Sequence, residues 1–192
     1  MKKGIATFSK YPIIKKEKVD FGSKNHGAIN SYVKVGKDTV QVLNCYLESN
    51  RLTTKDKDIT KWEKDNDPIK EIYNKLSDAA EKRRKQAELV VSKKNNKIPS
   101  IVCGDMNDTP ISYTYQQIAN LLKNAYEESG TGLGISFNRK EFPVRIDHIF
   151  TSKGLKSART FVNSKISSSD HRPIITNIYK NTETKQASNV PE

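Results

Sequence analysis

One long amphipathic segment, residues 67–93, constrains the fold of this chain more than any other stretch. Asp67 is suited to cap its start and Pro68 to occupy the first helical position. Its stripe follows the helical period and consists of Ile69, Ile72, Tyr73, Leu76, Ala80, Arg83, Ala87, Val90 and Val91. A helix with one apolar stripe must bury it against another layer, and the apolar β-type runs on both sides predict that this layer is a sheet.

The runs around this helix predict the other elements. Residues 28–47 form two alternating runs that meet at residues 36–38, which predicts a β-hairpin. Further strands are expected at residues 4–8, 98–103, 144–150, 158–162 and 172–179, with a turn at residues 9–12, a charged loop at residues 53–66, and a second helix at residues 112–123 that directs Ile118, Leu121 and Leu122 inward. The 192 residues are long enough for one domain, and the mixed order of elements predicts an α/β or α+β layered fold.

Composition limits the partners. The formal net charge of +12 favours anionic partners such as nucleic acid or phosphorylated substrates. Runs such as EKRRK are also typical of solvated helix faces, so charge alone does not identify a binding patch. Cys45 and Cys103 lie inside apolar runs, which favours buried free thiols over a disulfide. No apolar stretch reaches the length of a membrane span, so a soluble chain is expected for the sequence as given.

Acidic residues follow or begin several predicted strands. The segment IPSIVCGDMNDTP changes from β-formers to Asp105, Asn107 and Asp108, Asp147 lies within VRIDHIF, and Asp170 with His171 precedes the last strand. Taken singly, the cluster after IPSIVC is more typical of an ordinary turn. Asp147 alone is also compatible with an edge position or an ion pair with Arg145, and Asp170 with His171 is compatible with the start of a strand. Together they predict a site at one edge of a sheet, where several strands end.

The residue types at these positions favour one chemistry. Carboxylates and amides without a cysteine or second-histidine ligand suit a hard divalent cation, Mg²⁺ before Zn²⁺. An aspartate beside a histidine adds acid–base capacity and a donor toward phosphate. This combination predicts metal-assisted hydrolysis of a phosphoester.

With these motifs in order, the chain resembles the endonuclease/exonuclease/phosphatase family, the metal-dependent phosphodiesterases that include deoxyribonuclease I. The resemblance rests on GIATFSKYPI, LNCYLESNRL, IVCGDMNDTP, GISF, RIDHIF and SSDHRP. It implies a four-layered α/β/β/α sandwich, Mg²⁺ or Mn²⁺ as cofactor, and hydrolysis of a phosphorylated substrate, with nucleic acid, lipid and inositol phosphates all among the family's substrates. A monomer is expected.

The resemblance also implies residue roles. Asp105 would polarise or deprotonate the attacking water, and Asn107 would position that water and the phosphate oxygens. Asp170, together with Asp105, would contribute to the metal site. His171 would contact the scissile phosphate, with Asp147 fixing its tautomer and raising its basicity.

Tyr46 stands where many relatives carry a histidine. Its phenol can donate a hydrogen bond to a phosphate oxygen, which makes it a candidate catalytic residue. The alternative is that it only packs at the strand end.

A second departure concerns the start of the domain. In the family, an asparagine strand and a strand with a metal-binding glutamate precede the segment that here begins at residue 4. Residues 1–180 therefore resemble the C-terminal two-thirds of the domain, incomplete at its N-terminus, and residues 181–192 are expected to be a polar, disordered tail.

This departure affects the expected activity. Without the glutamate the chain alone is expected to be weakly active or inactive, with activity restored by the upstream segment. The alternative is a non-catalytic basic remnant of the fold that binds polyanions. Relatives with a stretch like LESNRL resemble membrane-tethered bacterial proteins, so localisation depends on what lies upstream.

Overall fold

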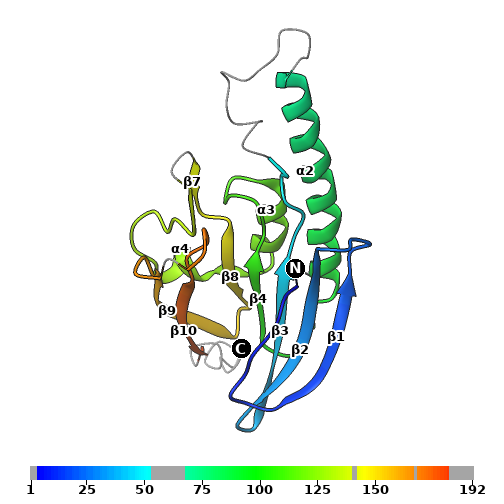
Figure 1. Cartoon of the computed structure of the whole chain (residues 1–192). Coiled ribbons are helices and arrows are strands. Elements are labelled where there is room, and N and C mark those ends of the chain that lie inside the picture. Colours follow the sequence, from blue (N-terminus) through cyan, green and yellow to red (C-terminus); the bar gives the residue numbers. More distant parts are fainter. Residues whose placement is uncertain (1–3, 53–67, 140–141, 167, 182–192) are drawn as a thin grey trace, which may run out of the picture.

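A six-stranded mixed sheet is the central element of the computed structural model, which describes residues 4–52, 68–139, 142–166 and 168–181 (Figure 1). In spatial order its strands are β1 (Ile13–Asp20), β2 (Gly27–Val35), β3 (Asp38–Tyr46), β4 (Ser100–Asp105), β8 (Asp147–Thr151) and β5 (Lys123–Asn124). Neighbouring strands are antiparallel except β3 and β4, which run parallel. The parallel pair brings the end of β3 beside the end of β4.

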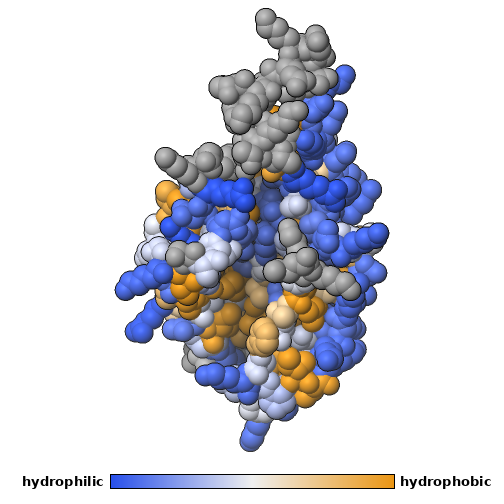
Figure 2. Space-filling model, in the orientation of Figure 1, coloured by the Kyte–Doolittle hydropathy of each residue, from blue (hydrophilic) through white to orange (hydrophobic). Residues whose placement is uncertain are grey.

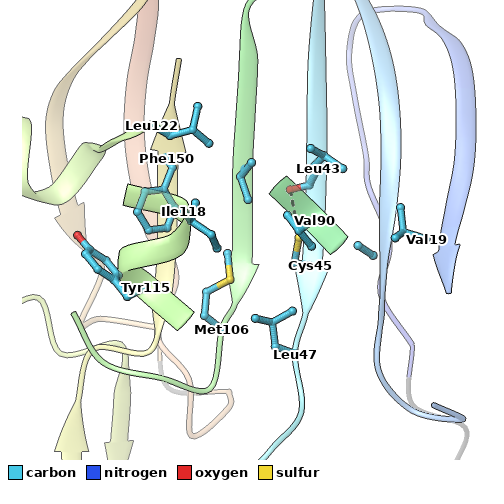
Figure 3. Packing of buried hydrophobic residues seen from close by; sticks show 12 residues of the cluster. Val19, Leu43, Cys45, Leu47, Val90, Met106, Tyr115, Ile118, Leu122 and Phe150 are labelled. Carbon is cyan, nitrogen blue, oxygen red and sulfur yellow. Dashed lines mark hydrogen bonds between the residues drawn. The ribbon is translucent and has the colours of Figure 1, made fainter. Parts of the chain in front are cut away.

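Two helices cover one face of this sheet. The elements are α2 (Pro68–Ser92) and α3 (Tyr113–Ala119), and the shorter α4 (Ala125–Ser129) follows β5. Figure 3 shows the resulting core, in which side chains from the helices meet those of the central strands. The buried cluster consists of Val19, Ala28, Leu43, Cys45, Leu47, Val90, Val102, Met106, Tyr115, Ile118, Leu122 and Phe150.

The opposite face of the sheet is less well covered. On β3, Leu43 and Cys45 point toward the helices and are buried, whereas Val40 and Val42 on the other face are only half-buried. Figure 2 shows hydrophobic residues gathered in the centre and lower part of the molecule on the side seen in Figure 1. The remaining strands form two small antiparallel sheets, β9 (Leu155–Val162) with β10 (Ile174–Lys180) and β6 (Phe137–Arg139) with β7 (Phe142–Val144).

Most predicted elements are confirmed. The hairpin of β2 and β3 turns at Gly36 and Lys37, α2 begins at Pro68, and strands occupy most of the four later β runs. Both cysteines are free, as expected. No helix among the described residues is long and apolar enough to cross a membrane. The proposed cap Asp67, the loop at residues 53–66 and the tail from residue 182 lie outside the described residues.

Three local predictions are wrong. Residues 4–8 are not a strand; their backbone lies against β3, where the Asn44 amide donates to the Ala6 carbonyl. Leu121 is 54% exposed because α3 ends at Ala119, before the helical period would turn this residue inward. The first half of the α2 stripe is also exposed, since Ile69 and Tyr73 lie on the part of the helix that extends beyond the sheet (Figure 1).

Candidate active site

Three side chains of the candidate site come from adjacent strands of the six-stranded sheet. Tyr46 at the end of β3 is in register with Asp105 at the end of β4, and Asp105 is in register with Asp147 at the start of β8. Neighbouring strands are about 4.8 Å apart, so these three residues form a row across the sheet. By the alternation of each strand, the row lies on the face that α2 and α3 leave open.

Gly104 allows β4 to approach β3 closely just before Asp105. Its φ of 134° is rarely adopted by residues with a side chain, and a Cβ at this position would lie 1.9 Å from the Cys45 carbonyl oxygen. The glycine in the GDMND motif is therefore required by the backbone that presents Asp105.

Asn107 holds the Asp105 carboxylate in one orientation. Its backbone N–H donates to Asp105 Oδ1 at 2.8 Å, and its side-chain Nδ2 donates to Asp105 Oδ2 at 3.2 Å and to the Leu47 carbonyl at 2.9 Å. Asn107 has a φ of 49°, a conformation that asparagine tolerates better than most residues. Both carboxylate oxygens of Asp105 thus accept hydrogen bonds from a single residue.

His171 lies between the two aspartates. Its Nδ1 is 2.8 Å from Asp147 Oδ2, and its Nε2 is 4.0 Å from Asp105 Oδ2. An ionised carboxylate only accepts hydrogen bonds, so Asp147 favours the tautomer that carries hydrogen on Nδ1. Nε2 is then the ring nitrogen that faces Asp105.

The electrostatics of the site shift two pKa values toward neutrality. Burial, followed by repulsion from Asp147, raises the pKa of Asp105 to about 6. The hydrogen bond from Asp147 raises the pKa of His171 above its ordinary value, although burial works in the opposite direction. Both groups are therefore able to exchange protons near neutral pH.

Asp105, Asp147 and His171 also form a candidate metal site. Each offers one ligand atom, and these atoms lie within 4.8 Å of one another. Two carboxylates and one imidazole are donors that a divalent cation accepts, and the oxygen-rich set fits Mg²⁺ or Mn²⁺. The donor set therefore fits the kind of cofactor that the sequence predicted.

Asp170 lies outside this group of three. Its Oδ2 accepts hydrogen bonds from Arg139 Nε at 3.1 Å and Nη2 at 2.9 Å. Burial works to raise the pKa of Asp170, but the bonds from Arg139 and the charge of His171 outweigh it and lower the pKa. The metal role given to Asp170 stays a prediction.

Tyr46 lies beside Asp105 on the neighbouring strand but is not one of the three grouped ligand residues. Its ring packs against the His26 ring with centroids 4.7 Å apart. Burial, then the charges of Asp105 and Glu48, raise the pKa of the phenol, so Tyr46 remains a neutral hydrogen-bonding group at neutral pH.

A buried polar network behind Tyr46 was missed in the sequence. Glu48 is 2% exposed, and its carboxylate pairs with His26 Nδ1 at 2.9 Å, with Arg51, and with Lys82 at 3.9 Å. Arg83 donates to the Glu48 carbonyl at 3.0 Å. One signal was available, because Arg83 is a charged residue within the apolar stripe of α2.

Comparisons with known proteins agree with this geometry. Residues 1–171 match the Endonuclease/Exonuclease/phosphatase family. No curated protein sequence matches the chain.

Solved structures share the fold at low sequence identity. An endonuclease/exonuclease/phosphatase from Beutenbergia cavernae has a TM-score of 0.66 and 17% identity, over 90% of this chain and 46% of that one. A mannosyl-6-phosphatase from Bacteroides thetaiotaomicron has a TM-score of 0.64 and 18% identity, over 88% of this chain and 67% of that one. An endonuclease/exonuclease/phosphatase from Bacteroides vulgatus has a TM-score of 0.65 and 18% identity, over 90% of this chain and 67% of that one. The chain thus spans less than half of the first structure and about two-thirds of the others.

The family match covers residues 1–171, which include the grouped residues Asp105, Asp147 and His171. The chain belongs to the endonuclease/exonuclease/phosphatase family.

Proposed function

We propose that the site built from Asp105, Asn107, Asp147 and His171 hydrolyses phosphoester bonds with a divalent metal ion, Mg²⁺ or Mn²⁺. One observation carries the proposal. His171 is bonded to Asp147 through Nδ1 and faces Asp105 through Nε2, so a histidine of fixed tautomer and a half-buried carboxylate converge on one small space.

Asp105 and Asn107 activate and position the attacking water. A carboxyl group with a pKa of about 6 accepts a proton near neutral pH better than an ordinary aspartate does. Asn107 donates hydrogen bonds to both carboxylate oxygens of Asp105 and so fixes the orientation of this carboxylate. Binding of the attacking water therefore costs little further conformational entropy.

His171 binds the phosphoryl group. The raised pKa of His171 increases the cationic fraction at neutral pH, and its Nε2–H donates to a phosphoryl oxygen as charge develops there. Asp147 keeps the ring oriented for that bond. Tyr46 contributes a neutral hydrogen bond from the neighbouring strand.

Asp105 and Asp170 would hold the metal ion in the arrangement that the family resemblance implies, and Asp147 and His171 are further ligands offered by the geometry. A bound divalent cation would offset the negative charge of the phosphoryl oxygens. Among the described residues the candidate group contains no glutamate, so we propose slow turnover for this chain alone.

The same proposal extends to the fold and the substrate. Residues 1–180 would form part of a four-layered α/β/β/α sandwich, and the two-stranded β9–β10 sheet supports a second sheet layer. Because one structural relative is a mannosyl-6-phosphatase, phosphomonoesters are tested beside phosphodiesters.

Hydrolysis of bis-p-nitrophenyl phosphate and p-nitrophenyl phosphate tests the proposal, with Mg²⁺, Mn²⁺ or a chelator. Activity that requires metal is expected, with a loss on the order of 100-fold in Asp105→Ala and in His171→Ala. Asp78→Ala, an exposed aspartate on α2, is the control and should keep full activity. Wild-type rates in both site variants would refute the assignment.

Slow turnover calls for a second readout. Titration of Mn²⁺ followed by electron paramagnetic resonance measures metal binding directly. Binding should weaken at least about tenfold in Asp105→Ala, because one of the charged ligands is lost. Equal affinity in Asp105→Ala and Asp78→Ala would place the metal elsewhere.

A further inference from the structure

A pocket of about 520 Å³ is built from residues other than those of the candidate active site. Its walls come from the connection between β1 and β2, from the chain just after β3, and from the middle of α2. None of Asp105, Asp147 or His171 lines it. The pocket is therefore a separate space for a ligand.

Part of the pocket wall is apolar and firmly anchored, and it adjoins the buried polar side chains of Glu48 and Gln86, which also line the pocket. Phe21 and Leu89 form the apolar part, and both side chains pack against the buried core cluster. Because core side chains have little freedom to move, this apolar surface is present before any ligand arrives.

The turn on the β1 side is also ordered. The Gly22 N–H donates to Asp20 Oδ1 at 3.0 Å, and the His26 N–H donates to Ser23 Oγ at 3.3 Å. These local bonds fix the backbone that forms one wall of the pocket.

The rim of the pocket carries an excess of positive charge. Four lining residues are cationic, namely Lys24, Arg51, Lys82 and Lys85, and two are acidic, namely Asp20 and Glu48. Four positive charges less two negative charges leave a formal charge of +2.

Glu48 is already subtracted in this count, and two of its partners, Arg51 and Lys82, are themselves rim cations. One carboxylate oxygen lies 2.9 Å from His26 Nδ1, and the other pairs with Arg51 and lies 3.9 Å from Lys82. Lys85 pairs with Glu81 at 3.3 Å, a contact between exposed side chains that a ligand can displace at little cost.

We propose that this pocket binds a small phosphorylated organic molecule, with the phosphoryl group at the lysine rim and an apolar or planar part against Phe21 and Leu89. The cationic rim favours a dianion over neutral ligands, and the apolar wall of Phe21 and Leu89 favours an organic phosphate over inorganic phosphate. The site does not depend on hydrolysis at Asp105, so its test is a binding measurement.

Phenylphosphonate is the probe, because it carries a dianionic head and a planar ring and contains no phosphoester bond. Its affinity for the whole chain is measured by calorimetry or by chemical-shift perturbation, with a chelator present to exclude divalent metals. Binding to the wild-type chain is expected, at least about tenfold tighter than that of inorganic phosphate.

Charge-matched double variants locate the bound probe. The double variant Lys82→Gln/Lys85→Gln should weaken binding at least about tenfold, since two cationic contacts are lost. The double variant Lys16→Gln/Lys97→Gln removes the same charge from exposed positions outside the pocket and should bind like the wild type. Asp105→Asn and His171→Ala should also bind like the wild type.

Four results would overturn the proposal. They are no detectable binding of phenylphosphonate, equal losses in the two double variants, loss of binding in Asp105→Asn or His171→Ala, and inorganic phosphate binding as tightly as the probe. Lys82 and Lys85 side chains are 52% and 67% exposed, so their replacement leaves the fold intact, which thermal unfolding verifies. Failure here would leave the hydrolysis test at Asp105 unaffected.

Discussion

At the scale of single residues, Asp105 shows the tension between stability and function most clearly. Burial and the neighbouring Asp147 disfavour its ionised form, and this raises the pKa of Asp105 from 3.8 to about 6. In the unfolded chain the same carboxyl group ionises near its ordinary pKa. The folded state therefore binds more protons between about pH 4 and pH 6, and this contribution to stability is lost as the pH rises through that window.

Asp105→Asn should stabilise the metal-free chain at pH 7. The amide removes the buried charge and still accepts the hydrogen bond from the Asn107 backbone N–H. We expect a gain on the order of 1 kcal/mol, below the limit set by the full pKa shift, because Asn107 Nδ2 loses its acceptor. Urea unfolding at pH 4 and pH 7 with a chelator measures it.

The pH dependence separates this cause from a general effect. The fall in unfolding free energy between pH 4 and pH 6 should be smaller in Asp105→Asn than in the wild type. Asp78→Asn, at an exposed position on α2, should keep the wild-type slope. Identical slopes in all three chains would contradict a raised pKa of Asp105.

At the scale of secondary-structure elements, one side chain ties α2 to the turns that carry the site. Arg83 is buried, and its Nε donates to Asp108 Oδ2 at 3.0 Å. Its Nη1 donates to the Glu48 carbonyl at 3.0 Å and to Asn50 Oδ1 at 2.7 Å. The turn after β4 and the chain after β3 are thus both held by the middle of the helix.

Arg83→Met should destabilise the fold by roughly 3 kcal/mol, because it leaves Asp108 and a buried carbonyl without their donor. Arg84→Met is the matched control on the next residue, where the guanidinium pairs with Glu81 and Glu88 at the surface, and its loss should be much smaller. Urea unfolding compares the two variants. Equal losses of unfolding free energy in the two variants would show that Arg83 does not stabilise the contact between α2 and these turns.

Local sequence patterns predicted several secondary-structure elements well. The hairpin around Gly36, the start of α2 at Pro68 and the strand that delivers Asp105 all depend on local periodicity and turn chemistry. The position of β1 at the edge of the sheet depends on pairing with β2, which residues 13–20 alone do not reveal.

The site residues divide in the same way into those that local patterns predicted and those that depend on long-range contacts. Asp105 was predicted to follow a strand and Asp147 to lie within one, and the structure brings both together with His171. The contacts of Glu48 with His26 and of Arg83 with Asp108 join segments far apart in the sequence. The charge of Arg83 within the apolar stripe of α2 indicated a buried polar contact, but not its partners.

At the scale of the whole molecule, the two faces of the sheet are unequal. The helices bury one face of the sheet, and the side chains of Asp105 and Asp147 lie on the other face. That other face also carries half-buried apolar residues such as Val42 and Ile101. A site at the border of an open face can receive a large substrate as well as a small one.

The net charge of +12 makes the polyanion-binding alternative testable on the intact chain. Binding of oligothymidylate, measured with a chelator that blocks metal-dependent cleavage, should weaken as salt rises. For a single strand the logarithm of affinity should fall with the logarithm of salt concentration by about 0.7 for each phosphate neutralised. A flat response would exclude an electrostatic binding surface. A steep fall of affinity with salt, together with no hydrolysis in the presence of Mg²⁺ or Mn²⁺, would favour a binding protein over an enzyme. In that case the positive charge would bind the polyanion without leading to its cleavage.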